Sequence, residues 1–183
     1  MIVNIIFDLI LLLLGVGGLL LGLRRGFLRS ILSTISLLLA MAFAALMATP
    51  IVGLFVRGSG SQVDPPIAIL FAGLLLAFYA ILETMMRRTF PVTRIPALGA
   101  LDNVLGAAVN IGWTLLALAL LVRVLGYSVY AISGSASYGL LGGWLTSSGL
   151  VSFLGNVLLI PIDLMRFLFP GGLPQPLRFF AGD

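Results

Sequence analysis

The chain has no cysteine and no histidine, its ten basic residues are all arginine, and only 9% of its 183 residues are charged. Without cysteine there is no disulfide framework, iron–sulfur cluster or reactive thiol. Without histidine the commonest metal ligand and general base is missing, and lysine is absent as a substitute base for a serine nucleophile. The sequence therefore predicts no catalytic residues, no metal and no cofactor.

Apolar residues, by contrast, make up 61% of the chain, and the mean hydropathy is +1.22. Soluble domains are about half apolar and about a quarter charged, so this chain cannot form a water-exposed surface of normal size. We therefore expect an integral membrane protein. The net charge of +4 comes from arginines at the ends of apolar runs, and this arrangement does not favour nucleic-acid binding.

Four apolar runs are long enough to cross a hydrocarbon core of about 30 Å as helices. They cover residues 2–23, 30–51, 67–86 and 101–122. We expect an all-α, polytopic membrane protein whose residues 1–125 form a domain of four transmembrane helices.

Arginine positions predict the orientation of these spans. The connection after the first span holds Arg24, Arg25 and Arg29, and the one after the third holds Arg87, Arg88 and Arg94, whereas the second holds only Arg57. Arginine-rich loops stay in the cytoplasm, so the predicted topology is N-out and C-out. Four of these side chains, Arg24, Arg25, Arg87 and Arg88, are predicted to anchor at lipid phosphate.

Residues 126–183 are predicted to form a tail on the outer side. Their first half is dense in glycine, which disfavours a straight helix. Within residues 150–169, Ser152, Asn156, Asp163 and Arg166 fall on one stripe of an otherwise apolar helix. This pattern favours an amphipathic helix in the membrane interface. A fifth span, with its polar stripe against the bundle, is the alternative.

Gly18, Gly22 and Gly26 are spaced four residues apart in the first span, so they leave one helix face open to close approach. We interpret this face mainly as packing within the chain. The second span is a plausible partner, through a face made of Ser30, Thr34, Ala40, Ala44 and Ala48. A seam between subunits is the alternative.

Few acidic and amide groups occur within the spans. Asp8 is interpreted as a carboxylate near the outer helix end, with an ion or proton site as the alternative. Glu83 precedes Arg87 by four residues, which favours an ion pair. Asp102 can cap free N–H groups at a helix start, and Asn110 can donate a hydrogen bond across helices.

Two stretches together resemble the colicin V production protein family of bacterial inner-membrane proteins. The first combines FDLI at residues 7–10 with LRRGFLR at residues 23–29, and the second is LDNVLG at residues 101–106. The resemblance implies that Asp8, Arg25, Gly26, Asp102 and Gly106 carry a family-specific role. The chain departs from the family pattern at two places. It has asparagine at position 103, where arginine is usual, and it has NIGWT at residues 110–114, where the family tends to have Gly-x-x-Arg-Gly.

The resemblance implies the bacterial inner membrane and an association with toxin export and envelope maintenance, and the family has no established enzymatic activity. We therefore predict a non-catalytic scaffold or accessory subunit that acts through helix and tail contacts. Its expected partners are membrane lipids and other membrane subunits or further copies of the chain, with no nucleic acid. A small transporter or channel component is the alternative.

Overall fold

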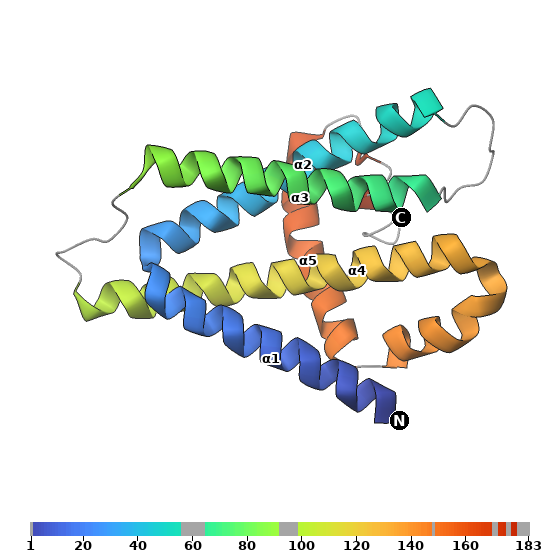
Figure 1. The fold of residues 1–183 in the computed structure, drawn as a ribbon, viewed down its shortest axis with the longest axis horizontal. Coiled ribbons are helices and arrows are strands. Elements are labelled where there is room, and N and C mark those ends of the chain that lie inside the picture. Colours follow the sequence, from blue (N-terminus) through green and yellow to red (C-terminus); the bar gives the residue numbers. More distant parts are fainter. Residues whose placement is uncertain are drawn as a thin grey trace.

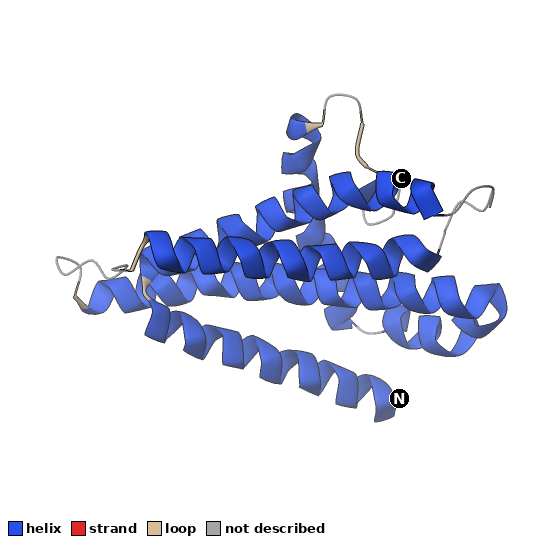
Figure 2. Ribbon diagram, turned by 45° about the horizontal axis from the view of Figure 1, so that its top comes forward, coloured by secondary structure: helices blue, strands red, loops and turns tan. Residues whose placement is uncertain are grey.

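The computed structural model describes residues 2–55, 65–91, 99–147, 149–169, 172–174 and 177–178. In this part of the chain five helices follow one another: α1 (Ile2–Arg25), α2 (Phe27–Phe55), α3 (Pro65–Thr89), α4 (Ala100–Ser147) and α5 (Gly149–Leu168). Within these ranges there is no strand (Figure 2). The all-α prediction is confirmed, and each of the four predicted spans lies inside one helix.

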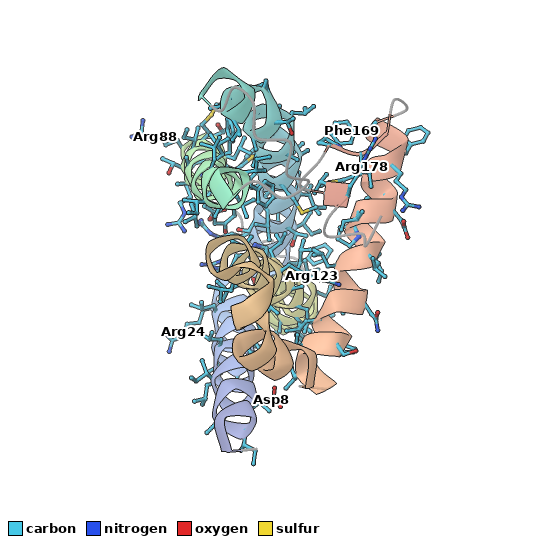
Figure 3. All side chains as sticks on the ribbon, turned by 90° about the vertical axis from the view of Figure 1, so that its right-hand side faces the viewer. Asp8, Arg24, Arg88, Arg123, Phe169 and Arg178 are labelled. Carbon is cyan, nitrogen blue, oxygen red and sulfur yellow. The ribbon has the colours of Figure 1, made fainter. Side chains whose placement is uncertain are left out.

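Helices α1 to α4 lie side by side along one axis, and α5 crosses them at a steep angle on one flank (Figure 1). Viewed from the end of the bundle, α1 to α4 are seen end-on, while α5 runs across the view beside them (Figure 3). If α1 to α4 follow the membrane normal, α5 therefore lies close to the membrane plane.

Helix α4 is longer than expected, because it continues through the glycine-rich segment to Ser147. The expected boundary after residue 125 thus falls inside a helix. The final part of α4 is nevertheless not straight, since its ribbon bends back on itself (Figure 1). The glycine-rich segment is therefore helical but bent, in agreement with the expectation that it does not form a straight helix.

Among the described residues, four helical stretches are long and apolar enough to cross a membrane: Phe27–Gly53, Ile69–Thr89, Ala100–Gly126 and Gly149–Phe167. Helix α5 thus has the length and the apolar composition that a membrane span requires. Helix α1 is not among these four stretches. Helix α1 is still 24 residues long and packs along α4, so we retain it as the first predicted span.

The exposure of the two faces of α5 distinguishes between the two interpretations of the tail, an interfacial helix and a fifth span with its polar stripe against the bundle. Leu154, Leu158 and Ile162 are fully buried against the bundle. The polar residues Ser152, Asn156, Asp163 and Arg166 are all exposed. The alternative of a fifth span with its polar stripe against the bundle is therefore wrong in this respect, because that stripe faces away from the other helices.

Helix α4 lies at the centre of the packing, against α1, α2, α3 and α5, and α2 packs on α3 and α4. In α2, Ala40, Ala44 and Ala48 are fully buried, and such small side chains allow helix backbones to approach. The sequence suggested that this face packs on α1. That prediction is wrong, because α1 packs mainly on α4 and touches α2 little.

Candidate functional site

Small and polar residues form a continuous seam where α1 and α4 run antiparallel. On both helices these residues recur every four positions, so each set occupies one face. The α1–α4 seam consists of Gly18, Gly22 and Gly26 from α1 and its end, and Asp102, Gly106, Asn110 and Thr114 from α4. Packing within the chain, the favoured interpretation of the glycine spacing, is what the fold shows.

Backbone approach in the seam is close enough to require glycine. A methyl group placed on Gly106 would lie 2.5 Å from the carbonyl carbon of Gly26, and one placed on Gly22 would lie 2.5 Å from Cβ of Asn110. The buried Asn110 side chain donates a hydrogen bond from Nδ2 to the Gly18 carbonyl oxygen. The predicted hydrogen bond of Asn110 across helices is therefore confirmed, with α1 as the acceptor.

The turn between α1 and α2 is a single residue, Gly26, with a φ of +82°. A side chain is strained in this left-handed conformation. Phe27, the first residue of α2, donates its backbone N–H to Oδ1 of Asp102 at 3.1 Å. Asp102 is only 3% exposed. The sequence predicted a helix-capping carboxylate here, but the N–H that it accepts belongs to α2 rather than to its own helix.

Glu83 is the centre of a second polar group at the same end of the bundle. Its Oε1 lies 3.1 Å from Nε of Arg87, which confirms the predicted ion pair, and 3.6 Å from Nη2 of Arg29. Its Oε2 accepts a hydrogen bond from the Ser33 hydroxyl at 2.9 Å. Both oxygens of this buried carboxylate are thus engaged by two helices.

The Arg25 guanidinium lies over an aromatic ring. Its Cζ lies 6.0 Å from the ring centroid of Trp113, a distance typical of a cation–π contact. Tyr79 also packs on Trp113, with its ring centroid 6.2 Å from that of Trp113. The Arg25 Nη1 atom is buried and has no hydrogen-bond acceptor in the part of the chain that the structure describes.

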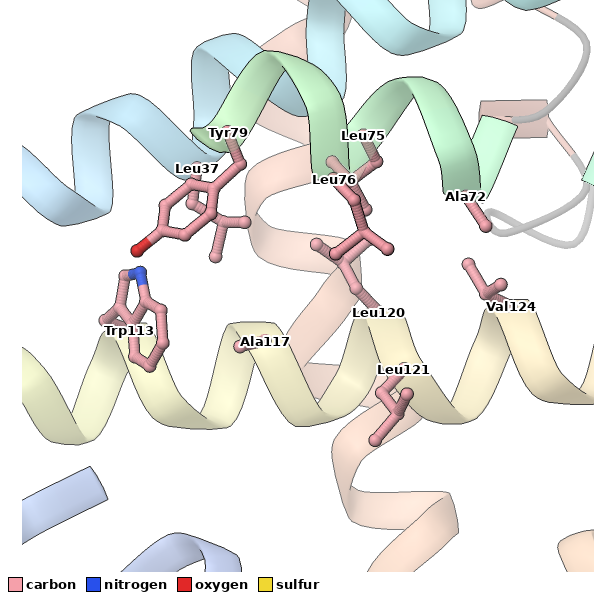
Figure 4. Close-up of a pocket in the computed structure, with 10 residues that line it drawn as sticks. All are labelled: Leu37, Ala72, Leu75, Leu76, Tyr79, Trp113, Ala117, Leu120, Leu121 and Val124. Carbon is pink, nitrogen blue, oxygen red and sulfur yellow. The ribbon is translucent and has the colours of Figure 1, made fainter. Parts of the chain in front are cut away.

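An apolar groove of about 260 Å³ begins at this aromatic pair. Tyr79 and Trp113 lie at one end of the groove, and Ala72 and Val124 at the other (Figure 4). Its remaining lining residues are Leu37, Leu75, Leu76, Ala117, Leu120 and Leu121, from α2, α3 and α4.

The structure brings together most of the predicted site residues but not all of them. Asp8 lies about 18 residues before Gly26 on α1, which is about 27 Å along a helix, and it is far from the Asp102 junction. Arg24 and Arg88 are exposed on the flank opposite α5 (Figure 3). Arg25 is part-buried, so it differs from the freely exposed arginines with which the sequence grouped it.

Sequence reasoning missed four members of this end of the bundle: Arg29, Ser33, Tyr79 and Trp113. Arg29 and Ser33 lie one turn apart on α2, a spacing that places both on the face toward Glu83. That spacing was a readable signal. Nothing local indicated the stacking of Arg25 on Trp113, because the two residues are 88 positions apart in the chain.

The buried polar residues that the structure describes gather toward one end of the bundle. They are Ser30, Ser33, Ser36, Glu83, Asp102, Asn110 and Thr114. From Asp102 to Thr114 is about 18 Å along a helix, just over half of a hydrocarbon core of about 30 Å. Beyond these positions the buried residues of α2 and α4, such as Met41 and Leu120, are apolar. The described residues hold no group of three or more metal-ligating side chains.

Comparison with known proteins gives one family. The family model described as colicin V production protein matches residues 7–158, which include the α1–α4 seam and the first half of α5. No curated protein and no solved structure matches the chain.

Proposed function

This chain belongs to the colicin V production protein family, and from that premise we propose that it is a non-catalytic scaffold or accessory subunit of a larger inner-membrane assembly. Membership indicates a membrane protein involved in toxin production or export, and the family is not known as an enzyme family. The proposed subunit acts through its helix surfaces and through α5.

The uneven distribution of buried polar groups carries this proposal. A transport pathway needs polar groups at successive depths of the membrane. Here the described buried polar residues occupy one half of the bundle, and Asp102, Glu83 and Asn110 are engaged in contacts that hold helices together. The other half of the described interior is apolar. This arrangement supports a structural role for the polar groups.

We place the arginine-rich end in the cytoplasm and α5 toward the outer surface. Leu154 of α5 lines a cavity with Leu115 and Leu118 of α4, and Gly155 lies against the Arg123 guanidinium. Asn156 lies on the face of α5 opposite Leu154, so the polar strip faces away from the bundle. An interfacial helix of the outer leaflet would turn such a strip toward water.

The test is the composition of the native particle. The tagged protein is extracted in mild detergent, and the mass of the intact particle and the identity of each chain are measured. A particle with other subunits in fixed ratio supports an accessory role. The chain alone, as a monomer or closed homo-oligomer, contradicts it.

A small transporter or channel component is the second candidate, and Asp8, part-buried within the apolar α1, is the observation in its favour. Flux through liposomes that contain only this protein, lost on Asp8→Asn, would replace the first proposal with the second.

A further inference from the structure

We propose that a notch between α2 and α3 binds the phosphate group of an acidic phospholipid, with Arg29 and Arg87 as the donors. The notch lies at the arginine-rich end of the bundle, and its other lining residues are Leu32, Ser33, Glu83, Met86 and Phe90. This inference goes beyond a scaffold role, because it assigns the protein a lipid ligand. It also separates Arg29 and Arg87 from the exposed Arg24 and Arg88.

One carboxylate oxygen positions the two guanidinium groups of the notch. Oε1 of Glu83 lies 3.1 Å from Nε of Arg87 and 3.6 Å from Nη2 of Arg29. These two nitrogens are therefore at most 6.7 Å apart, the sum of the two distances. Phosphate oxygens accept charge-assisted hydrogen bonds of about 2.8 Å, so a single phosphate group can contact both guanidinium groups.

Most hydrogen-bond donors of these two arginines remain available. A guanidinium group has five N–H donors, and within the described part of the chain the partner of both arginines is Glu83. Glu83 has no oxygen to spare, since the Ser33 hydroxyl donates to its Oε2 at 2.9 Å. Two arginines and one carboxylate leave a net charge of +1, which an anion balances.

The notch is open to the surroundings of the protein. The Arg87 side chain is 55% exposed and the Arg29 side chain 24%, in contrast to the buried Nη1 atom of Arg25. The volume of the notch is about 10 Å³, which is room for one atom the size of a water oxygen. One phosphate oxygen fits there, while the rest of the headgroup lies outside, beside the apolar side chains of Met86 and Phe90.

The notch lies at the depth of the lipid headgroups. Arg29 is the third residue of α2, and Arg87 precedes the last residue of α3 by two positions. Both lie within about one turn of a helix end, where long arginine side chains reach the membrane interface. Basic pockets between helices on the cytoplasmic side are typical binding sites for acidic lipid headgroups. The arginine-rich end, which we place in the cytoplasm, meets this description.

The charges around the notch favour an acidic headgroup over a zwitterionic one. Asp102 and Glu83, the carboxylates that the structure describes at this end, are both engaged, Asp102 by the N–H group of Phe27. The cation of an ethanolamine or choline headgroup therefore meets no free carboxylate here. Phosphatidylglycerol carries the phosphate without that cation. The described arginines at this end of the bundle are Arg24, Arg25, Arg29, Arg87 and Arg88.

Native mass spectrometry of the chain measures this preference. The protein is purified in detergent and titrated with phosphatidylglycerol or with phosphatidylcholine of the same acyl chains, and the dissociation constant of the first bound lipid is determined for each. We expect phosphatidylglycerol to bind about fivefold more tightly, the ratio that one net positive charge near the membrane surface gives at about 1 kcal/mol. Equal affinities in the parent chain overturn the proposal.

Three glutamine variants locate the preference. Arg29→Gln and Arg87→Gln each remove the net charge of the notch and should bring the ratio of the two dissociation constants close to one. Arg88→Gln removes the same charge from the neighbouring exposed position and should keep most of the preference. Equal losses in Arg87→Gln and Arg88→Gln contradict a site at the notch.

Arg87→Lys keeps the charge, and it tests the notch even if the glutamine variants do not fold. A lysine ammonium does not reproduce the planar fork with which arginine contacts a carboxylate and a phosphate at once. This variant should lower the preference by about twofold or more, while the helix content measured by circular dichroism stays at the parent value. An unchanged preference would mean that overall charge alone attracts the lipid, and this result refutes the notch.

Inorganic phosphate is another source of the same chemical group, and thermal unfolding in detergent distinguishes it from the lipid. A ligand that binds only the folded protein raises the midpoint temperature. Phosphatidylglycerol should raise that temperature more in the parent than in Arg87→Gln, and inorganic phosphate at the same concentration should leave both unchanged. Stabilisation of the parent by inorganic phosphate, lost in Arg87→Gln, would assign the notch to a soluble phosphate and overturn the lipid proposal.

Discussion

Replacement of Gly106 by alanine tests the closest contact of the α1–α4 seam. The added methyl group would lie 2.5 Å from the carbonyl carbon of Gly26 and 2.8 Å from its oxygen. These are backbone atoms of a one-residue turn, so they cannot move without shifting α1 or α2. Extra methylenes forced into packed sites cost about 1–3 kcal/mol. Gly106→Ala should lower the free energy of unfolding by that amount, less the gain in helix propensity.

Gly112→Ala is the matched control. Gly112 lies on the same helix, and no atom lies within 4 Å of the position that its Cβ would occupy. Both substitutions gain about 0.5–1 kcal/mol of helix propensity, so the difference between them isolates the clash. Equilibrium unfolding with SDS in dodecyl maltoside micelles, followed by tryptophan fluorescence, measures both. Equal stability of the two variants would refute the described approach of α1 to α4.

Three further results are expected. Asp102→Ala should lower the free energy of unfolding by about 0.5–2 kcal/mol through loss of the cap on α2, and Asp102→Asn, which keeps an acceptor oxygen, should lose less in the same assay. Glu83→Gln should lower the free energy of unfolding by about 1–3 kcal/mol, because the Glu83 side chain is only 11% exposed. Arg87→Gln should lower it by less than about 1 kcal/mol, because the Arg87 side chain is 55% exposed. Similar losses in the two variants would contradict a structural role of the buried Glu83 carboxylate. Ser152→Cys, at an exposed position of α5, should react with a membrane-impermeant maleimide added to intact cells, and Leu154→Cys, at a fully buried position, should not; the chain has no other cysteine, and labelling of Ser152→Cys only after the membrane is opened would contradict the outer location of α5.

Helix positions could be predicted because membrane spans leave a local signal. A run of about 20 apolar residues by itself predicts a helix, because a single segment in lipid can satisfy all its backbone hydrogen bonds only as a helix. The ends were less predictable. Helix α2 begins at Phe27 rather than near Ser30, because its first N–H group is satisfied by Asp102, which lies far along the chain.

The components of the α1–α4 seam were visible in the sequence, but their pairing was not. A small-residue face shows that some helix will approach, and both α2 and α4 carry such faces. The choice of α4 follows from complementarity along the whole seam, where Gly22 meets Asn110 and Gly26 meets Gly106. The polar stripe of α5 illustrates the same limit, because periodicity shows that a helix has two faces and leaves open which one meets the bundle.

The Asp102 cap also orders the steps by which the protein is made. The acceptor for the first N–H group of α2 is encoded 75 residues later than the helix that needs it. At about 5–20 residues per second, a ribosome takes about 4–15 s to cover that interval. For that time the α1–α2 hairpin stands in the membrane with its turn uncapped and the glycine face of α1 uncovered. Insertion of α4 caps the turn and covers the glycine face at the same time. The first hairpin of the nascent bundle is therefore complete only after the fourth helix has been synthesised.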